Sequence, residues 1–497
     1  MKINRREFLS ATGVALISST VFAKTKKRVI VAGAGLAGLS AAYELSLKGF
    51  DVTVIEGRNR VGGRVFTLKE PFTDGQFVEL GGELVGNGYK RLLGYAKKFG
   101  VDYEEVPDEI QTSGSVATLQ GGIGTTAVMK GKIYPIGSVL NPHPYNLKGD
   151  EAAMLPPNLL GKYIRQIMKE SVGKTDVMSE LDKLSLADVL RQRGVSETAI
   201  NLMNISLNYN SIETVSAAGI MFDGTRRSGA GTRANRITGG NSEIPKALYT
   251  NAKKNGVKFI FDAKIKQISR KSNSVKVSFT DKQGRTQNLS SDKLVCTIPF
   301  SVLREVKFSP SLPKEKTTAI NELAYTQITK IYLQANRFDW DSRNFGSSIW
   351  TDTPCERIFN AAGKKGDNHG IFTMWLDGEG AKLPDKMNDQ DRQKWAKQEF
   401  EKALPLMKGT VDRIATKSWG NDEFVRGSYS HFTRGQFMSL SPNLKTAVGS
   451  IHFAGEHTAE KSPGMEGALE SAERVVAEIS DSKFQIEEIL VNLKYGI

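Results

Sequence analysis

The feature that most constrains this chain is a glycine-rich loop enclosed by two short hydrophobic strands. The β-branched run at 28–32 is typical of a buried parallel strand. The loop at 33–38 follows it directly, a helix is expected over 39–48, and a second strand over 51–55 ends at Glu56. A dinucleotide-binding fold requires this order of strand, loop, helix and strand.

Each glycine of the loop has its own physical task. Gly33 permits a tight turn, Gly35 lets the backbone approach a pyrophosphate, and Gly38 allows the helix to pack closely on the sheet. The N-terminus of the helix offers free N–H groups and the positive end of its dipole to phosphate. Glu56 lies 18 residues beyond Gly38, near the spacing at which a carboxylate binds ribose hydroxyls. The sequence therefore predicts a bound dinucleotide.

Two further glycine-rich segments indicate which dinucleotide is bound. Residues 57–64 follow the ribose acid, and residues 79–86 come next. Both resemble segments of the flavin amine oxidase superfamily, the group of the monoamine oxidases and L-amino-acid oxidases. In that family the first segment lies along the FAD pyrophosphate, where a cation balances the phosphate charge, and the second passes near the flavin ring. Enzymes that bind NAD alone lack this pattern, so the resemblance implies FAD.

A matching pair of segments stands near the C-terminus. Residues 451–458 are expected to form a strand that ends in a Gly-Glu turn, and residues 463–468 open a helix over 469–479. The resemblance implies that Glu456 contacts the ribitol chain and that the helix start points at the flavin pyrimidine. The helix dipole would there stabilise negative charge on the reduced ring.

Two middle segments extend the resemblance over most of 27–480. A strand is expected over 257–268, where the backbone of Ile265 would meet the adenine, and a strand at 293–299 would return the chain to a second domain. The residues that the resemblance implies for FAD binding are Gly33, Ala34, Gly35, Leu36, Ala37, Gly38, Glu56, Gly57, Arg58, Gly63, Arg64, Gly81, Gly82, Glu83, Ile265, Gly455, Glu456, Gly464, Met465, Glu466 and Ala468.

The expected fold class is α/β, with a Rossmann-like FAD-binding domain (GR2 type) and an inserted substrate domain of mixed sheet and helices. The FAD-binding domain is expected to be discontinuous, from 27–110, 230–300 and 420–480. The substrate-binding domain is expected from 111–229 and 301–419, and a C-terminal helix or tail from 481–497. Helical periodicity over 111–225 predicts a helical part of the substrate domain.

Lys330 and Tyr429 are the candidates for catalysis. Lys330 lies among alternating strand residues, a pattern that by itself is more typical of a solvated face. In the family that the chain resembles, a lysine at this point holds a water against flavin N5 and helps O2 react with the reduced flavin. Phe338-Asp339-Trp340 fits the same family pattern. Tyr429 matches an aromatic wall that guides the amine and excludes water, although a core tyrosine is the alternative.

Two residues depart from the family pattern. Ser428 stands where covalently flavinylated monoamine oxidases carry their linking cysteine, and serine cannot form the thioether, so noncovalent FAD is expected. Gly464 stands where the opposite aromatic wall is usual, so the pocket is open on that side or closed from elsewhere. Trp350 and Trp375 are candidates for closing it.

The substrate stays open between an amine and an L-amino acid. Snake-venom L-amino-acid oxidases place an arginine for the substrate carboxylate two residues past the second glycine of the 79–86 segment, where this chain has Leu84. The segment also resembles microbial L-amino-acid oxidases that lack this arginine. Another anchor could come from the basic cluster, for which a solvated loop is the competing and favoured interpretation. The cluster consists of Arg226, Arg227, Arg233 and Arg236.

The resemblance implies FAD-dependent oxidative deamination. A hydride passes from the C–N carbon to flavin N5, the imine is hydrolysed to a carbonyl compound plus ammonia, and O2 reoxidises the flavin and gives H2O2. Two alternatives stay open. One is a periplasmic amine dehydrogenase that passes electrons to a carrier protein, and the other is a C–C desaturase or protoporphyrinogen-oxidase-like flavoprotein.

Residues 1–23 resemble a twin-arginine signal peptide. Arg5-Arg6 precedes Phe8-Leu9, a moderately apolar stretch at 11–22 and a small-residue cleavage site at 21–23. We expect export of the folded protein to the periplasm or the medium. The mature chain would begin near Lys24.

Composition argues against several other classes. The net charge of +14 contains no long Lys/Arg block, so it is interpreted as solvated surface, and no nucleic-acid partner is expected. The body of the chain contains no run of 18 or more uncharged apolar residues, so no integral membrane span is expected. Two cysteines, Cys296 and Cys355, make neither a disulfide framework nor a metal-ligand set. The expected partners are a small amine or L-amino acid and O2, and a homodimer is left open.

Overall fold

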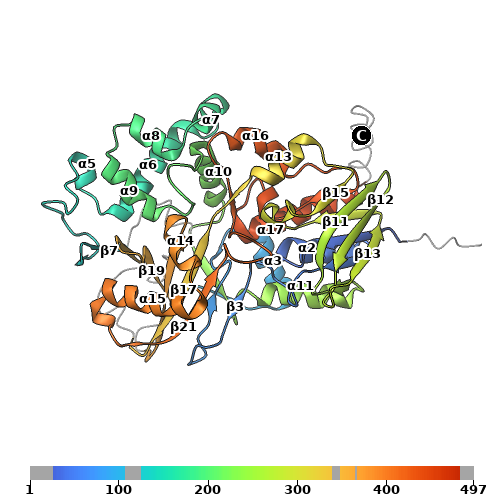
Figure 1. The fold of residues 1–497 in the computed structure, drawn as a ribbon, viewed down its shortest axis with the longest axis horizontal. Helices are drawn as coiled ribbons and strands as arrows, with labels where there is room; N and C mark the ends of the chain where they lie inside the picture. The colour runs from blue at the N-terminus through green and yellow to red at the C-terminus, as the bar shows by residue number, and fades with distance from the viewer. Residues whose placement is uncertain (1–25, 107–124, 338–347, 364–366, 482–497) are drawn as a thin grey trace, which may run out of the picture.

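The computed structural model describes residues 26–106, 125–337, 348–363 and 367–481, arranged as in Figure 1. Within these residues, the framework consists of a five-stranded, a four-stranded and a seven-stranded sheet with helices packed against them. The predicted signal peptide, the Phe338-Asp339-Trp340 match and residues 482–497 of the expected tail lie outside the described residues.

The five-stranded sheet is parallel throughout and is buried on both faces. Its strand order is β10 (Lys258–Ile260), β2 (Asp51–Ile55), β1 (Arg28–Ala32), β14 (Lys293–Cys296) and β23 (Ile451–Phe453). In β1, Val29 and Val31 belong to one hydrophobic core, whereas Ile30 and Ala32 belong to another on the opposite face. Burial on both faces explains the unbroken hydrophobic run at 29–32.

Four helices supply the first of these cores. They are α2 (Leu36–Leu47), α3 (Lys90–Phe99), α11 (Glu243–Lys254) and α17 (Gly464–Ser480). Helices α2 and α17 lie side by side. Helix α17 begins at Gly464, five residues earlier than expected, because Pro463 takes the extended N-cap position and the helix starts directly after it.

The second core lies between the parallel sheet and the four-stranded sheet. That sheet has the order β13 (Thr286–Ser291), β12 (Ser274–Thr280), β11 (Lys264–Lys271) and β15 (Lys307–Ser309). The prediction of one strand over 257–268 is wrong. The chain turns at Asp262, with φ of +51°, so that β10 joins the parallel sheet and β11 joins the four-stranded one.

The seven-stranded sheet is the largest of these three sheets. Its order is β21 (Val411–Ser418), β17 (Ile328–Ala335), β20 (Gly370–Asp377), β19 (Arg357–Ala362), β18 (Ser348–Thr351), β7 (Thr125–Met129) and β8 (Lys132–Tyr134). Helices α14 (Glu379–Asp385) and α15 (Asp389–Ala403) pack against it. The prediction of helical structure over 111–225 is wrong for β7 and β8, because β7 pairs with β18 and β8 pairs with β7 at the edge of the sheet.

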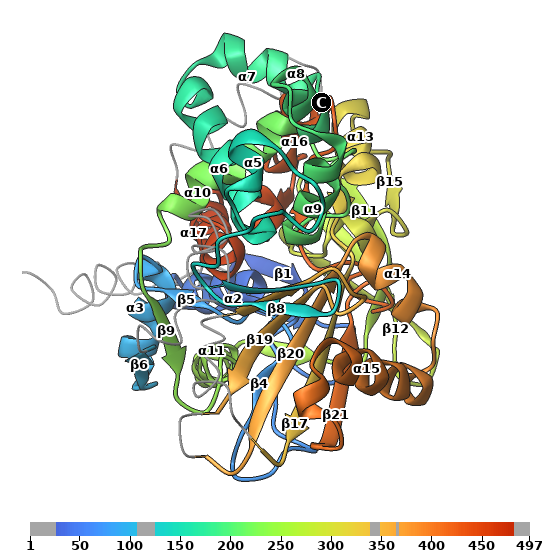
Figure 2. The ribbon, with the colours of Figure 1, turned by 90° about the vertical axis from the view of Figure 1, so that its left-hand side faces the viewer.

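A group of helices from the 149–228 region stands over this sheet in the view of Figure 2. They are α5 (Gly149–Ala152), α6 (Pro156–Ser171), α7 (Thr175–Asp182), α8 (Leu186–Gln192), α9 (Glu197–Ser206) and α10 (Ala217–Ser228). Ser216 caps α10, because its hydroxyl accepts the Gly219 N–H at 3.1 Å. Shorter elements connect these parts. They are β3 (Thr67–Leu68), β4 (Val78–Glu79), β5 (Val85–Gly86), β6 (Tyr103–Glu105), β9 (Ala234–Ile237), β16 (Ala324–Tyr325), β22 (Ser430–His431), α12 (Phe300–Leu303), α13 (Lys314–Glu322), α16 (Gln436–Leu444), η2 (Pro405–Met407) and η3 (Glu456–Thr458).

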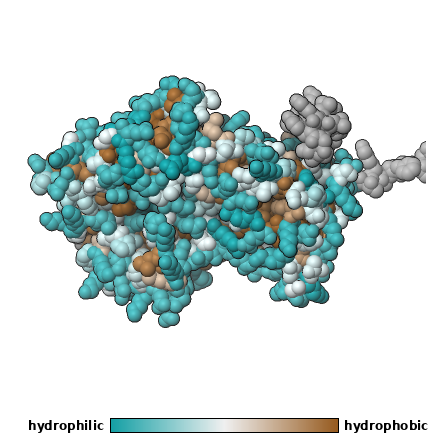
Figure 3. All heavy atoms as spheres, turned by 45° about the horizontal axis from the view of Figure 1, so that its top comes forward, coloured by the Kyte–Doolittle hydropathy of each residue, from teal (hydrophilic) through white to brown (hydrophobic). Residues whose placement is uncertain are grey.

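The surface in Figure 3 is mainly hydrophilic, with hydrophobic residues in small scattered groups. In the part of the chain that the structure describes, no helix combines the length and the apolar character needed to cross a bilayer. Cys296 and Cys355 are both buried and free. The sheets and helices have the predicted α/β class, while the predicted domain limits stay a prediction.

Candidate active site

The carboxyl ends of β1, β2 and β14 open onto a cavity of about 390 Å³. Its lining comes from the loops after these strands, from α10, from the start of α17 and from β17, β19 and β20. Ligands of open α/β sheets bind outside the carboxyl ends of the strands. The volume is within the range of small-molecule and cofactor sites, about 300–1,000 Å³.

The glycine-rich loop has the shape that a phosphate group requires. Gly33 has φ of +106°, and a Cβ at Gly38 would lie 2.0 Å from the carbonyl oxygen of Gly33. A Cβ at Gly35 would meet no atom within 4 Å, so the space beside Gly35 is open on the cavity side. The loop is therefore closed towards the helix and open where a pyrophosphate would approach.

Gly62 and Gly63 pack against this loop. The N–H of Gly62 donates to the carbonyl of Ala34 at 2.8 Å, and a Cβ at Gly63 would lie 3.2 Å from the Cα of Gly35. Both residues have positive φ, +99° and +56°. Backbone meets backbone here, which explains why the segment needs two glycines in succession.

Glu56 links the end of β2 to the loop. Its carboxylate accepts the N–H of Ala34 at 2.6 Å and that of Arg58 at 2.9 Å. Burial raises the pKa of Glu56, and these two hydrogen bonds oppose the shift. A carboxylate offers about four acceptor sites, so positions remain for the hydroxyls of a ribose.

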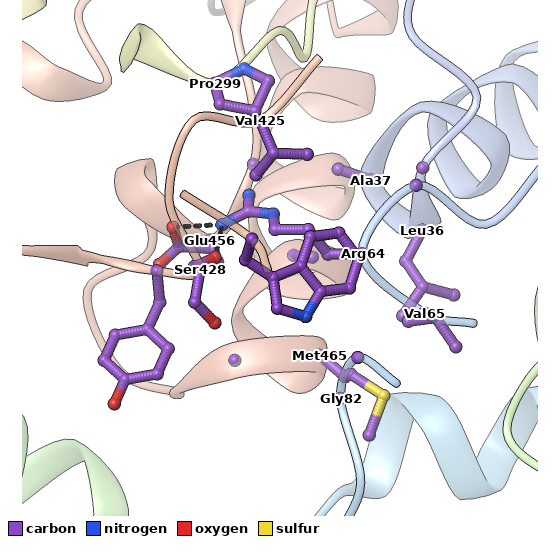
Figure 4. A pocket seen from close by; sticks show the side chains of 18 of the residues that line it. Leu36, Ala37, Arg64, Val65, Gly82, Pro299, Val425, Ser428, Glu456 and Met465 are labelled. Carbon is purple, nitrogen blue, oxygen red and sulfur yellow. Dashed lines mark hydrogen bonds and ion pairs between the residues drawn. The ribbon is translucent and has the colours of Figure 1, made fainter. Parts of the chain in front are cut away.

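Arg64 joins the two ends of the sequence across the cavity, as Figure 4 shows. Its Nη1 donates to the carbonyl oxygen of Ser428 at 2.7 Å and to the carboxylate of Glu456 at 2.9 Å. Glu456 also accepts the N–H of Ser430 at 3.1 Å. The glycine-rich segments predicted at both ends of the chain therefore meet at one ion pair.

Most of the residues predicted to bind the cofactor line this one cavity. They are Gly33, Gly35, Leu36, Ala37, Glu56, Gly57, Arg58, Gly63, Arg64, Gly81, Gly82, Glu83, Ile265, Gly455, Glu456, Gly464, Met465 and Ala468. Ala34 and Gly38 lie behind the loop and support it. Glu466 lies outside the cavity, and its carboxylate caps α3 by accepting the N–H groups of Arg91 at 2.9 Å and Leu92 at 3.1 Å. The carboxylate of Glu466 is therefore engaged in capping α3, and a contact of this residue with the cofactor stays a prediction.

Lys330 is 2% exposed, so the solvated-face interpretation is wrong. From β17, its Nζ donates to the carbonyl oxygens of Glu79 at 3.0 Å and Gly81 at 3.1 Å, and to the carboxylate of Glu83 at 2.9 Å. It also lies 4.6 Å from the centre of the Trp375 ring. These contacts fix the ammonium group at the cavity wall built by the 79–86 segment.

Tyr429 lines the cavity from the loop before β22. Its hydroxyl donates to the carbonyl oxygen of Asn208 at 2.6 Å, and its ring meets Tyr209 edge to face with 6.2 Å between ring centres. Burial raises the pKa of Tyr429, so the phenol stays protonated. The residue is thus held as a fixed aromatic wall.

Trp375 and Phe359 form a second aromatic surface of the cavity. Their rings pack edge to face at 6.3 Å. Trp350, the other tryptophan considered, is buried in the core of the helical group. Gly464 lines the cavity without a side chain. Trp375 is therefore the tryptophan that can supply a wall in place of the residue that Gly464 lacks.

The basic cluster divides into two parts. Arg226 and Arg227 line the cavity from the last turn of α10, so the solvated-loop interpretation is wrong for these two residues. Arg233 lies at the surface in an ion pair with Glu105, as that interpretation expected. Arg236 donates to a backbone carbonyl of β19 at 3.2 Å.

Asp223 and Arg357 are among the charged cavity residues that sequence reasoning did not identify. Asp223 precedes Arg226 by three residues and Arg227 by four, a spacing that places all three side chains on one face of a helix. This spacing could have indicated the group from the sequence. Burial alone would raise the pKa of Asp223, but the two arginines lower it below its usual range. Arg357, from β19, donates to the Asn208 side chain at 2.6 Å and pairs with a buried aspartate of β20. No local motif identifies Arg357.

Comparison with known proteins shows which family this chain is similar to. Residues 36–480 match the family described as flavin containing amine oxidoreductase. The L-amino-acid oxidase of Gloydius halys is 24% identical over 471 residues, which cover 92% of this chain and 90% of that protein. A putative L-amino-acid oxidase of Bacillus subtilis (strain 168), YobN, is 27% identical over 469 residues, covering 91% and 95%.

Solved structures give the same fold. Wild-type putrescine oxidase bound to putrescine has a TM-score of 0.74 at 18% identity, over 91% of this chain and 99% of that one. Cyclohexylamine oxidase from Brevibacterium oxydans IH-35A has a TM-score of 0.73 at 18% identity, over 92% and 99%. The predicted fold class is confirmed. A flavin family and a dinucleotide-type loop together confirm FAD as the cofactor. The chain therefore belongs to the family of flavin containing amine oxidoreductases.

Proposed function

We propose that this enzyme oxidatively deaminates a small primary amine or amino acid, with O2 as the electron acceptor. The observation that carries the proposal is that a single cavity joins the dinucleotide loop to Lys330 and to the aromatic surfaces of Tyr429 and Trp375. An amine held there would lie in an aromatic-lined pocket next to the cofactor. Relatives named L-amino-acid oxidase and a structural neighbour named putrescine oxidase support the same reaction class.

The protein's part in such a reaction is binding, orientation and exclusion of water. Tyr429 and Trp375 present rigid ring faces to the substrate, and their fixed contacts set its orientation. Bound FAD supplies the acceptor for the hydride and the carrier of two electrons to O2. The amine becomes an imine, which water hydrolyses to a carbonyl compound and ammonia, while O2 is reduced to H2O2.

Lys330 supplies a preorganised positive charge at the cavity wall. Its ammonium group has three donors, and three protein oxygens accept from it. Glu83, with 25% of its side chain exposed, is the partner that faces the cavity. A water molecule held by Lys330 would therefore compete with Glu83. A fixed cation of this kind stabilises negative charge that develops beside it.

Product analysis under air tests the proposal. The purified holoprotein would be incubated with a panel of amines and amino acids, and ammonia, H2O2 and O2 would be measured. One ammonia and one H2O2 per substrate molecule is the expected result. Ammonia without H2O2, together with reduction of an added cytochrome, would favour the amine dehydrogenase. Oxidation of a C–C bond without ammonia would favour the desaturase-like alternative.

We also propose noncovalent FAD and export by the twin-arginine route. Ser428 lines the cavity, and its hydroxyl has no chemistry for a thioether link to the flavin. The Arg5-Arg6 pair supports export. Replacing both arginines with lysine should retain the holoprotein in the cytoplasm, and unchanged export would contradict this part of the proposal.

A further inference from the structure

At the end of the cavity that faces α10 and the seven-stranded sheet, two arginines share one carboxylate. Four cations there pair with three carboxylates: Arg226 and Arg227 with Asp223, Lys330 with Glu83, and Arg357 with Asp377. The nearby His431 adds no charge at neutral pH, because burial lowers its pKa to about 4. Since Arg226 and Arg227 share Asp223, this group of three side chains keeps one positive charge. A partly buried, unpaired charge is costly, so this end of the cavity favours an anionic ligand.

Among the described residues of this group, Arg227 is the arginine whose two terminal nitrogens are unused. Its Nε donates to Oδ2 of Asp223 at 2.5 Å. Neither of its terminal nitrogens hydrogen-bonds any residue in the described ranges 26–106, 125–337, 348–363 and 367–481. The side chain is 16% exposed and lines the cavity. The guanidinium group thus presents a free pair of donors, the geometry that binds a carboxylate in a bidentate manner.

The other two arginines at this end of the cavity, Arg226 and Arg357, use both terminal nitrogens in hydrogen bonds. Arg226 donates through Nη2 to Asp223 at 2.7 Å and through Nη1 to the carbonyl of Ala459 at 3.4 Å. Arg357 donates through Nη1 to Asn208 at 2.6 Å and through Nη2 to Asp377. The Nε of Arg226 and that of Arg357 also lack a partner, but among the described residues of this group only Arg227 has both terminal nitrogens free.

Asp223 holds Arg227 in place. It is 7% exposed and accepts, besides the two arginines, the hydroxyl of Tyr209 at 2.5 Å. The charge of Arg227 also acts on Tyr429, whose pKa it lowers against the larger effect of burial. The free guanidinium donors and the aromatic wall that orients the amine thus belong to one site.

We propose that Arg227 binds the carboxylate of the substrate, and that the site is therefore selective for α-amino acids over simple amines. The inference rests on the proposed function. Leu84 lines the same cavity but carries no charge, so the carboxylate is held from the α10 side instead of from the 79–86 segment. In an α-amino acid the carbon that loses the hydride also carries the carboxylate. By holding the carboxylate, Arg227 would therefore position the reacting carbon and act as a specificity-determining residue.

Ligand binding without turnover gives the first test. Benzoate and its neutral analogue benzamide would be titrated into the holoprotein, and the flavin absorbance would report the dissociation constants. We expect benzoate to bind at least tenfold more tightly than benzamide, and this preference to vanish in Arg227→Met. Arg227→Lys should retain part of it, because lysine keeps the charge and loses the planar fork. Arg233→Met is the matched control and should behave like the wild type. Equal binding of the two probes, or a preference that survives Arg227→Met, would overturn the inference.

Anaerobic flavin reduction gives the second test and separates the two proposals. L- and D-amino acids would be compared with the amines that correspond to them without the carboxylate. Arg227→Met should raise the half-saturating amino-acid concentration by at least about 30-fold, while reduction by the amines changes little. Reduction by amines alone would overturn the Arg227 inference and leave the proposed function standing. Reduction by no amine or amino acid, with the benzoate preference intact, would overturn the proposed function and leave the carboxylate site. Thermal unfolding and FAD content of each variant would exclude a folding defect.

Discussion

Gly35→Ala should change folding and cofactor binding in opposite directions. Gly35 has φ of −74° and ψ of 179°, values that alanine adopts without strain, and a Cβ there meets no atom within 4 Å. The substitution should therefore stabilise the apoprotein by about 0.4–1 kcal/mol, since alanine restricts the unfolded chain. The same methyl group would enter the space needed by the FAD pyrophosphate, where overpacking costs about 1–3 kcal/mol. FAD affinity should fall by roughly 5- to 150-fold.

Gly38→Ala is the control for this prediction. Its Cβ would lie 2.0 Å from the carbonyl oxygen of Gly33, a backbone atom that cannot move without opening the loop. This variant should lose both apoprotein stability and FAD binding. Urea unfolding of the apoprotein and titration with FAD, followed by flavin fluorescence, measure the two quantities separately. An unchanged FAD dissociation constant in Gly35→Ala, or an apoprotein less stable than the wild type, would refute the placement of the pyrophosphate.

Three further predictions concern the site and its surroundings. Lys330→Met should slow reoxidation of the reduced flavin by O2 by about two orders of magnitude, because it removes the fixed cation. The FAD dissociation constant should change only a few-fold. An unchanged reoxidation rate in stopped-flow measurements would contradict the role of Lys330. The pKa of His431 is lowered to about 4 by burial, against about 6.5 in the unfolded chain. As the pH falls, the unfolded chain therefore binds a proton that the folded protein does not. The free energy of unfolding should fall by about 2 kcal/mol between pH 7 and pH 5. Urea unfolding of His431→Gln should show a smaller loss over the same range. Acid precipitation should release all FAD into the supernatant, and flavin that stays with the precipitated protein would contradict noncovalent binding.

The cofactor half of the site was predictable because its signals are local. The tasks of Gly33, Gly35 and Gly38 follow from one loop between two strands, and the structure places these residues as that pattern requires. The break at Asp262 was not predictable, because residues 257–268 are uniformly strand-like and the change of sheet depends on tertiary pairing.

The substrate half depends on contacts between distant elements. Arg357 and Trp375 lie on neighbouring strands β19 and β20, and only the folding of the seven-stranded sheet brings them to the cavity. Lys330 had the alternating pattern of a half-solvated strand, yet both faces of β17 are buried. Glu466 stood in a cofactor motif, but its carboxylate caps α3, a helix far away in the sequence.

The central claim is that the amine's α-carbon gives up a hydride inside the cavity shared by the dinucleotide loop, Lys330 and Tyr429. The most direct measurement is the rate of anaerobic flavin reduction by a substrate that carries deuterium at the α-carbon, compared with the unlabelled substrate. Hydride transfer from this carbon should remove the absorbance of the oxidised flavin, and the deuterated substrate should react several-fold more slowly. Equal rates for the two substrates under single-turnover conditions, or no reduction by any amine or amino acid, would contradict it.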